Sequence, residues 1–331
     1  MATISKRGPY QFQVQIRRKG HPIQTKTFDT KREAEAWVSV IESEMTRGVF
    51  YDRSEAEQTT LEEALDRYLR EVTPTKAGAI RERQRIEVWK RHPLAKRSLA
   101  SLRSADFAQY RDARRKVVGA STVRLELALI SHVYTIASVE WCIPLTNPIL
   151  NITKPKLPEG RDRRLQEGEE EALLAAASES KAAPWLRACI QLAMETGMRA
   201  GEILSLKWNQ VHLDQQVIKL SKTKNGERRT VALTSKAVNV LKGLPRSISN
   251  KVIPRFGHTT NLGHAFSIAC KAAGIEDLHF HDLRHEAASR FAPHMKAQVL
   301  AKIMGWKTIQ MAMRYYNPTD SELVAAVRHS S

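Results

Sequence analysis

The sequence predicts a multidomain, mainly α chain: a small N-terminal β-sheet plus helix module, an all-helical bundle, and a mixed α+β domain. Three observations support this fold class. Apolar and polar residues alternate, as in β-strands, over residues 9–28 and 215–233. Most other segments carry apolar residues at three- and four-residue spacing, which is typical of amphipathic helices. A connector with prolines and a basic run, residues 151–164, divides the chain, and 331 residues suffice for two or three domains.

The first module is expected over residues 1–55. The turn RRKGHP divides the alternating run at 9–28, which predicts a β-hairpin. A helix follows, with Thr30 as its N-cap and Glu33 three residues on. A small sheet and one helix form only a marginal core, so this module fits an accessory binding unit better than a catalytic one. The polar residues 51–60 are predicted to be a linker.

The second domain is expected over residues 59–152 as a bundle of helices. It opens with a Thr60–Glu63 capping box, and Pro144 and Pro148 are expected to end it. The segments with helical spacing of apolar residues are 60–72, 78–94, 104–117 and 121–141.

The third domain is expected over residues 160–331 and is mostly helical with one strand insertion. The second of its helices is closed by Gly197, and the hairpin at 215–233 is expected to turn at Asn225 and Gly226. Helices are predicted at 167–180, 184–197, 234–242, 260–273, 281–291, 296–304 and 307–316.

The chain is strongly basic, with 53 Lys and Arg against 35 Asp and Glu and a formal net charge of +18 at pH 7. This excess implies a polyanionic partner, and nucleic acid is the commonest one in a cytosolic protein. No basic amphipathic anchor favours a membrane, and no apolar run approaches about 18 residues. Without a signal-peptide centre, the chain is expected to stay in the cytoplasm. The three scattered cysteines, Cys142, Cys189 and Cys270, fit a reducing compartment.

Basic side chains in the helical bundle outnumber the acids near them, which suggests that part of its surface faces DNA phosphates. A solvated basic face is the alternative interpretation. The DNA-binding candidates are Arg81, Arg83, Arg85, Lys90, Arg111, Arg114, Arg115 and Lys116 in the bundle, with Arg17, Arg18 and Lys19 in the first module.

The string TGMRAGEI places Arg199 at the start of a helix whose next turn holds Glu202. A guanidinium there can present two parallel donors to a phosphate, while the carboxylate braces it or its neighbours. The alternative is an ordinary surface ion pair between residues three apart on a helix.

The string LHFHDLRHEAASRF places His281, Arg284 and His285 on one helix face. A metal pair of His281 and His285 is a poor interpretation, because neither a third ligand nor a cysteine pair accompanies it, so no metal site is predicted. A second interpretation makes Arg284 another phosphate-binding cation with His281 as an adjacent donor. A capped structural helix is the open alternative.

Two further segments carry candidate chemistry. Lys222 and Lys224 lie where a β-turn could lower one cation into a groove. A lysine there is usually solvated, but near a phosphoryl centre it is a candidate acid for a leaving alkoxide. The adjacent Tyr315 and Tyr316 diverge by about 100° on a helix, so only one of them can attack a given phosphate and the other is expected to pack.

TGMRAGE, a hairpin lysine, HDLRH, a GW turn and a tyrosine nine residues later together resemble the tyrosine recombinase (phage integrase) family. The similarity covers the C-terminal half, and HDLRHEAAS is among the family's most distinctive strings. Residues 59–152 resemble its core-binding domain, and the first 55 residues resemble an arm-type DNA-binding module. TVRLELALISHVYTIASVEW, GRDRRL and LHFHDLRHEAASRF also resemble shufflon-type DNA invertases, whereas the N-terminal sheet favours an arm-domain integrase.

The resemblance implies a catalytic set in a tyrosine-recombinase catalytic domain. Its members are Arg199 and Arg284 as the clamp on the scissile phosphate, His281 as the proton-handling donor, Lys222 as the general acid toward the leaving 5′-oxygen, Glu202 as the structural acid, and Tyr315 as the nucleophile. Trp306 stands where most members carry histidine. Its indole can donate to a phosphate oxygen but cannot accept a proton, so a shuttle role there is in doubt.

The implied activity is that of a site-specific DNA recombinase (integrase), acting through a 3′-phosphotyrosyl intermediate without metal, ATP or cofactor. The expected partners are double-stranded DNA at recombination sites, a synaptic homo-tetramer formed from free monomers, and a DNA-bending or directionality factor. The tail at 319–331, with Leu323, Val324 and Val327 on one face, is expected to dock on a neighbouring subunit or on its own domain. The alternatives are a shufflon-type invertase of the same chemistry, a catalytically inactive DNA-binding regulator, and a topoisomerase-like nicking enzyme.

Overall fold

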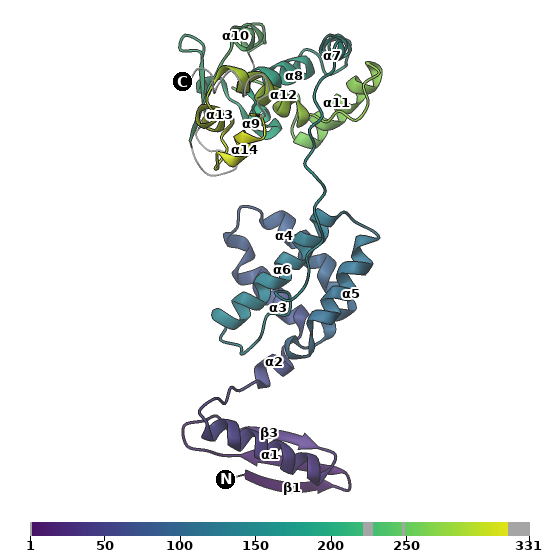
Figure 1. Cartoon of the computed structure of the whole chain (residues 1–331), viewed down its shortest axis with the longest axis vertical. Helices are drawn as coiled ribbons and strands as arrows, with labels where there is room; N and C mark the ends of the chain where they lie inside the picture. The colour runs from purple at the N-terminus through teal and green to yellow at the C-terminus, as the bar shows by residue number, and fades with distance from the viewer. Residues whose placement is uncertain (1, 221–227, 247–248, 317–331) are drawn as a thin grey trace, which may run out of the picture. The chain divides into compact units, whose positions relative to one another are not determined.

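The computed structural model describes residues 2–220, 228–246 and 249–316. The chain divides into two compact units, Met1–Glu159 and Gly160–Ser331 (Figure 1). Their boundary falls inside the predicted connector, and residues 153–166 form neither helix nor strand. The mainly helical, multidomain fold class is confirmed.

The first unit begins with a three-stranded antiparallel sheet. Strands β1 (Ala2–Gly8), β2 (Gln11–Ile16) and β3 (Gln24–Phe28) lie in the order β1-β2-β3, and α1 (Lys31–Thr46) packs on this sheet. The β2–β3 hairpin was predicted and β1 was not. Strand β1 carries few apolar residues and is held mainly by main-chain pairing with β2, so it leaves little periodic signal.

The predicted N-cap of α1 is confirmed, because the Thr30 side chain accepts a hydrogen bond from the Glu33 amide at 3.2 Å. The prediction of a linker at residues 51–60 was wrong, since α2 (Ser54–Gln58) forms there. Ala56 is its one buried side chain and joins the core of the following helices, so a single apolar residue had given no visible periodicity.

The second core of this unit is built from helices. The capping box at its start is confirmed: Thr60 Oγ1 accepts from the Glu63 amide at 3.2 Å, and the Glu63 carboxylate accepts from the Thr60 amide at 2.8 Å. In the middle Trp89 stacks on Tyr110 with ring centroids 3.9 Å apart. The elements are α3 (Leu61–Glu71), α4 (Ala79–Lys90), α5 (Ser104–Arg115) and α6 (Ala120–Val139), with 3₁₀ turns at Thr73–Thr75, Pro93–Lys96 and Leu99–Ser101.

The second unit combines helices with a small antiparallel sheet of order β4-β5-β6. The helices are α7 (Glu169–Ser178), α8 (Trp185–Thr196), α9 (Ala200–Ser205), α10 (Ser235–Lys242), α11 (Thr259–Ala272), α12 (Asp282–Phe291), α13 (Ala297–Met304) and α14 (Gln310–Met313), with 3₁₀ turns at Trp208–Gln210 and Ala292–His294. The strands are β4 (Val211–His212), β5 (Val217–Leu220) and β6 (Arg229–Ala232). The predicted helix at 307–316 is shorter than expected, so the two tyrosines follow α14 in a turn.

Helices α8 and α12 pack against each other in the core of the second unit (Figure 1). Helix α8 ends at Gly197, which has φ 62° as the prediction of a closing glycine requires. A Cβ at Gly197 would lie 2.5 Å from Met304 Sδ, so the ends of α8 and α13 meet closely. This junction places α9, α12 and the end of α13 around one small region.

Some predictions fall outside the described ranges. These are the turn at Asn225 and Gly226, Lys222, Lys224, and the tail at 319–331. Within the ranges that are described, no helix is both long and apolar enough to cross a membrane.

Candidate active site

Three arginines from different elements bind the C-terminal end of α13. The carbonyls of residues 303–305 are among the last of that helix and lack partners within it. Arg229 Nη1 donates to the first of them at 2.9 Å, Arg284 Nη2 to the second, and Arg199 Nη2 to the third at 3.4 Å. Cations are favoured at this end of the helix dipole. We call Arg199, Arg229 and Arg284 the arginine cluster.

Gly305 makes this close approach possible. It has φ 63°, and a Cβ there would lie 2.7 Å from Arg229 Cδ. Glycine therefore serves both the left-handed turn at the end of α13 and the contact with a buried arginine. The turn delivers Trp306 next to the arginine cluster.

Glu202 is the buried acid of the cluster. Its carboxylate lies 2.9 Å from Arg199 Nη1 and 2.8 Å from Arg229 Nη2, and it also accepts from the Arg199 amide at 3.0 Å. The sequence suggested an ion pair of Arg199 with Glu202, and the structure shows that Arg229 shares the same carboxylate. Two guanidinium groups thus share one carboxylate and a third, Arg284, lies beside them, so the site is strongly electropositive.

Arg284 is almost fully buried, at 4% exposed. It donates to the Gly197 and Met304 carbonyls and has no ion pair with a carboxylate among the residues described. Burial, followed by the charges of Arg199 and Arg229, lowers the pKa of its guanidinium. A cation in this position is stabilised when an anion binds beside it.

Tyr315 lies against Trp306 at the edge of the cluster. The two rings are parallel within 7° and their centroids are 5.4 Å apart. The guanidinium carbon of Arg284 lies 5.7 Å from the centroid of the indole. Burial raises the pKa of the Tyr315 phenol above its usual value, although Arg314 and Arg284 oppose that shift. The protonated phenol of Tyr315 therefore lies near the positive charges of Arg284 and Arg314.

The Tyr315 hydroxyl is hydrogen-bonded to His285 Nδ1. The neighbouring Tyr316 points elsewhere, because its hydroxyl donates to the Met295 carbonyl at 2.5 Å. The expectation that the two tyrosines diverge is confirmed. Tyr316 has a structural bond, whereas Tyr315 is directed towards the helix that carries Arg284.

His281 stands at the exposed start of α12. Its ring meets the His285 ring edge-on, with centroids 5.4 Å apart and planes at 85°. No group of three or more His, Cys, Asp or Glu side chains suited to a metal ion occurs in the described segments. The two imidazoles contact each other, and His285 also contacts Tyr315.

The DNA-binding candidates of the bundle fall into two groups. Three of them already have acidic partners: Lys90 lies 2.8 Å from Asp66, Arg111 lies 2.8 Å from Asp112, and Arg114 lies 2.9 Å from the buried Glu126. The others have no ion pair with any residue in the described part of the chain; they are Arg81, Arg83 and Arg85 on α4 and Arg115 and Lys116 at the end of α5.

The candidates of the first module lie just after β2. Arg17, Arg18 and Lys19 are all exposed there. Arg18 Nη1 donates to Thr46 Oγ1 at 2.9 Å, so this side chain also ties the turn to the end of α1.

The chain segment at 161–165 crosses α12, and we call it the strap. Arg161 Nη2 lies 3.0 Å from Asp282, and Arg164 Nε lies 3.2 Å from Glu286. Both acids are on α12 and nearly buried, at 2% and 4% exposed. The strap therefore holds the helix that carries Arg284 and His285.

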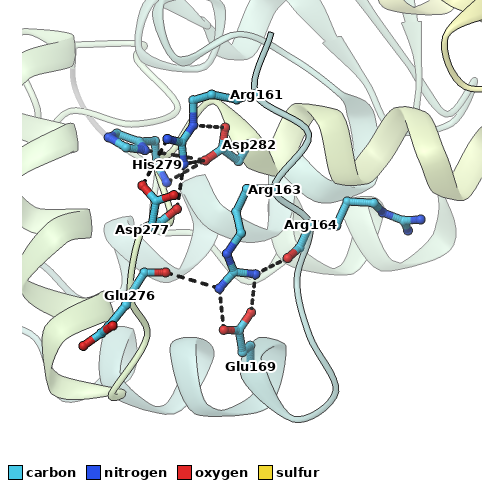
Figure 2. Close-up of polar contacts among 8 residues, drawn as sticks. All are labelled: Arg161, Arg163, Arg164, Glu169, Glu276, Asp277, His279 and Asp282. Atoms are coloured by element: carbon cyan, nitrogen blue, oxygen red, sulfur yellow. Dashed lines mark hydrogen bonds and ion pairs between the residues drawn. The ribbon is translucent and has the colours of Figure 1, made fainter. Parts of the chain in front are cut away.

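Three further contacts fix the strap. Arg163 lies against Glu169 at 2.5 Å and also reaches the carbonyl of Glu276, and Arg161 bonds Asp277 at 3.0 Å (Figure 2). The basic run of GRDRRL was predicted to belong to the connector at 151–164, and the string also resembles shufflon-type invertases. In the structure, its arginines hold α12 in place within the second unit.

Sequence reasoning missed two residues of the site. Arg229 belongs to RRTVAL, which was predicted as the second strand of the hairpin at 215–233. The alternation that buries Val231 also turns Arg229 inward. His285 was considered only as a metal ligand. Its i,i+4 relation to His281 was visible, but its contact with Tyr315 depends on a residue 30 positions away.

Together these groups are chemically suited to nucleophilic attack on a phosphate ester. Arginines can hold the nonbridging oxygens and a phenol can attack. This is the chemistry expected of a phosphoryl-transfer enzyme with a tyrosine nucleophile.

Comparison with known proteins gives the family. Residues 163–322 match the phage integrase family. A shufflon-specific DNA recombinase of Escherichia coli is 40% identical over 277 residues, which cover 80% of this chain and 71% of that protein. A putative integrase/recombinase of Haemophilus influenzae is 35% identical over 335 residues, which cover 97% of this chain and 89% of that protein.

Solved structures share the fold. A lambda integrase dimer bound to a COC′ core site has a TM-score of 0.67 at 20% identity, over 95% of this chain and 94% of that chain. A lambda integrase tetramer bound to a Holliday junction has a TM-score of 0.65 at 20% identity, over 92% and 95%. The chain belongs to the phage integrase, or tyrosine recombinase, family. It is a site-specific DNA recombinase, and the resemblance read from its motifs is confirmed.

Proposed function

We propose that Tyr315 is the nucleophile with which this recombinase cuts DNA. Its phenolic oxygen would attack a backbone phosphorus, forming a 3′-phosphotyrosyl bond and releasing a 5′-hydroxyl. The covalent bond retains the energy of the phosphodiester, so a partner strand can be joined without ATP. The observation that carries this proposal is convergence: Arg199 and Arg284 bind the successive carbonyls of Gly305 and Met304, and Tyr315 stacks on the next residue, Trp306.

The arginines would hold the scissile phosphate. Negative charge develops on the nonbridging oxygens in the transition state, and fixed guanidinium donors stabilise it. Arg284 has carbonyl partners but no carboxylate among the residues described, so it is the stronger candidate for a phosphate oxygen. Arg199 remains bound to Glu202, which would fix its orientation. Removing one such donor typically lowers the rate by roughly 10²–10³.

Three other residues complete the proposed site. His281, exposed at the start of α12, would donate to the phosphate from the solvent side. The Trp306 indole would add a further donor while its ring face supports Tyr315. Lys222, which lies outside the described ranges, is the proposed acid toward the leaving 5′-oxygen.

The remaining domains would bind DNA around this site. We assign residues 160–331 to catalysis, 59–152 to the core site and 1–55 to arm-type sites. The arginines of α4 and of the end of α5 that have no ion pair with a described residue support the second assignment. The lambda integrase relatives were solved as a dimer on a core site and a tetramer on a Holliday junction. By analogy this chain would act in the cytoplasm as a tetramer of otherwise monomeric protomers on DNA.

A nicked suicide duplex tests the nucleophile. The nick lets the short 5′-hydroxyl fragment diffuse away, so wild-type protein should accumulate a covalent adduct visible by denaturing electrophoresis. Tyr315→Phe should form none, while Tyr316→Phe should retain it and lose only the bond to Met295. An adduct that survives Tyr315→Phe but is lost in Tyr316→Phe would reverse the assignment of the two tyrosines.

Inversion of a DNA segment is the second candidate outcome. The 40% identity to a shufflon-specific DNA recombinase favours it. Sites from the DNA that flanks the gene are placed as an inverted pair on one plasmid or singly on two plasmids: an invertase rearranges the inverted pair, whereas an integrase also joins the two separate plasmids.

A further inference from the structure

The contact between His285 and Tyr315 carries chemistry that the family resemblance did not assign. His285 Nδ1 and the Tyr315 hydroxyl are hydrogen-bonded, and the two rings are also stacked, with centroids 6.0 Å apart and planes at 30°. His285 lies on α12 directly after Arg284, so one helix turn carries both a phosphate-binding cation and a partner for the phenol. The bond joins residues 30 positions apart and is a tertiary contact of the site itself.

Burial and the neighbouring charges shift the pKa values of His285 and Tyr315, and these shifts indicate whether the nitrogen or the oxygen holds the shared proton. Burial, followed by the neighbouring positive groups, lowers the pKa of the His285 imidazole below its usual value. The groups that face it are His281, Arg314 and Arg284, which lower that pKa, Asp282, which raises it, and the Tyr315 hydroxyl. An imidazole with a lowered pKa is neutral at pH 7 and has a free lone pair on one ring nitrogen. Since burial raises the pKa of Tyr315, the phenol keeps its proton and donates it to Nδ1.

We propose that His285 is the general base that activates Tyr315. As the phenolic oxygen forms its bond to phosphorus, the O–H bond breaks and the proton passes to His285 Nδ1. The P–O5′ bond breaks on the opposite side, and the leaving oxygen takes a proton from a separate acid. During rejoining the 5′-hydroxyl attacks phosphorus and passes its proton to the conjugate base of that separate acid, the bond between phosphorus and the Tyr315 oxygen breaks, and the His285 imidazolium returns its proton to the departing phenolate. This assignment rests on the proposed function, in which Tyr315 is the nucleophile.

The two histidines of HDLRH, His281 and His285, have different roles in this proposal. His281 is exposed and one turn earlier on α12, where it can meet a phosphate from the solvent side. His285 is half-buried between α12 and the Tyr315 ring. The edge-on contact of the two rings places His281 where its charge disfavours protonation of His285. A cation at His281 therefore helps to keep the base neutral.

The test measures single-turnover cleavage of the nicked suicide duplex by full-length wild type and His285→Asn. Asparagine can accept a hydrogen bond from the phenol through Oδ1, but an amide does not take up a proton. We expect DNA binding to be unchanged and cleavage at pH 7 to fall by roughly 10²–10⁴, the usual contribution of general acid–base catalysis. The deficit should shrink as pH rises, because ionisation of the phenol by solvent replaces the base. Cleavage within a few-fold of wild type at all pH values would overturn the proposal.

A second substrate separates a base from an acid. In a duplex with a bridging 5′-sulfur, the leaving thiolate needs no proton, so loss of a leaving-group acid is masked. The His285→Asn deficit should persist on this substrate. Full recovery would show that His285 serves the leaving group instead and would overturn the proposal.

Two controls make the result unambiguous. If His285→Asn fails to fold, as judged by circular dichroism, His285→Gln is used with the same expectation. Tyr315→Phe is assayed in parallel: adduct formation by that variant would refute Tyr315 as the nucleophile and with it the proposed function. Loss of the adduct in Tyr315→Phe, together with wild-type cleavage in the histidine variant, would refute only the role of His285.

Discussion

Replacing Gly305 by alanine is expected to destabilise the catalytic unit and to slow cleavage through one contact. The new Cβ would lie 2.7 Å from Arg229 Cδ and 2.9 Å from Arg229 Nη1. Carbon atoms in favourable contact are about 3.5–4.0 Å apart, so the arginine has to move. Because Arg229 also binds Glu202 and the Ile303 carbonyl, movement disturbs both bonds.

The expected magnitude follows from two contributions. Holding alanine in the left-handed conformation found at Gly305, φ 63°, costs about 1–2 kcal/mol. Displacing Arg229 from Glu202 breaks a buried ion pair, since the two side chains are 6% and 8% exposed. Loss of one partner from such a pair costs about 3–5 kcal/mol. We therefore expect a loss of unfolding free energy between about 1 kcal/mol, if Arg229 adjusts, and about 7 kcal/mol, if it leaves.

The assay is urea unfolding of the full chain, followed by circular dichroism, together with cleavage of the suicide duplex. Gly263→Ala is the matched control, because Gly263 lies within α11 and a Cβ there meets nothing within 4 Å. That control should gain about 0.5–1 kcal/mol from its helical position. Wild-type stability and wild-type cleavage in Gly305→Ala would refute the described approach of Arg229 to the end of α13.

Two further predictions concern the strap and the DNA surface. Burial by itself raises the pKa of the Glu286 carboxyl, but hydrogen bonds and charges from Arg164 and Arg290 together outweigh it and hold that pKa below its usual range. This contribution is present above the unfolded pKa and is lost as pH falls through the folded one. Glu286→Gln should therefore reduce stability at pH 7 and flatten its decline below about pH 4.5 in thermal unfolding scans; an unchanged profile would contradict the role of the strap. Arg81→Gln should reduce the slope of log affinity against log salt by about one phosphate contact, whereas Arg114→Gln should mainly destabilise the fold; equal slopes for Arg81→Gln and wild type would remove Arg81 from the interface.

Much of the fold followed from local pattern. The helices of the bundle and of the second unit were predicted because their apolar spacing and their caps, such as Thr30 and Thr60, act over a few residues. Strand β1 and helix α2 were missed because their stability depends on pairing with β2 and on the burial of one alanine. Neither contact is visible from local periodicity.

Prediction of the site from the sequence is limited in the same way, because it depends on contacts between residues far apart in the chain. Motif residues such as Arg199, Arg284 and Tyr315 could be named because the resemblance supplies their roles, and the structure brings them together. Arg229 and His285 could not be assigned, because their roles depend on the turn at Gly305 and on the position of Tyr315 in space.

The coil that precedes the strap limits how far its two anchored ends can separate before tension acts on α12. The Thr153 and Pro155 carbonyls accept hydrogen bonds from Arg111 and Arg124, so the coil between these anchors and Arg161, the first anchored side chain of the strap, is residues 156–160. Fully extended, five residues span roughly 16–18 Å, at about 3.3–3.6 Å per residue. This length is the largest separation that the coil allows between its two anchored ends. Beyond it, the first bonds to bear the force are the arginine–carboxylate pairs that seat the helix carrying Arg284.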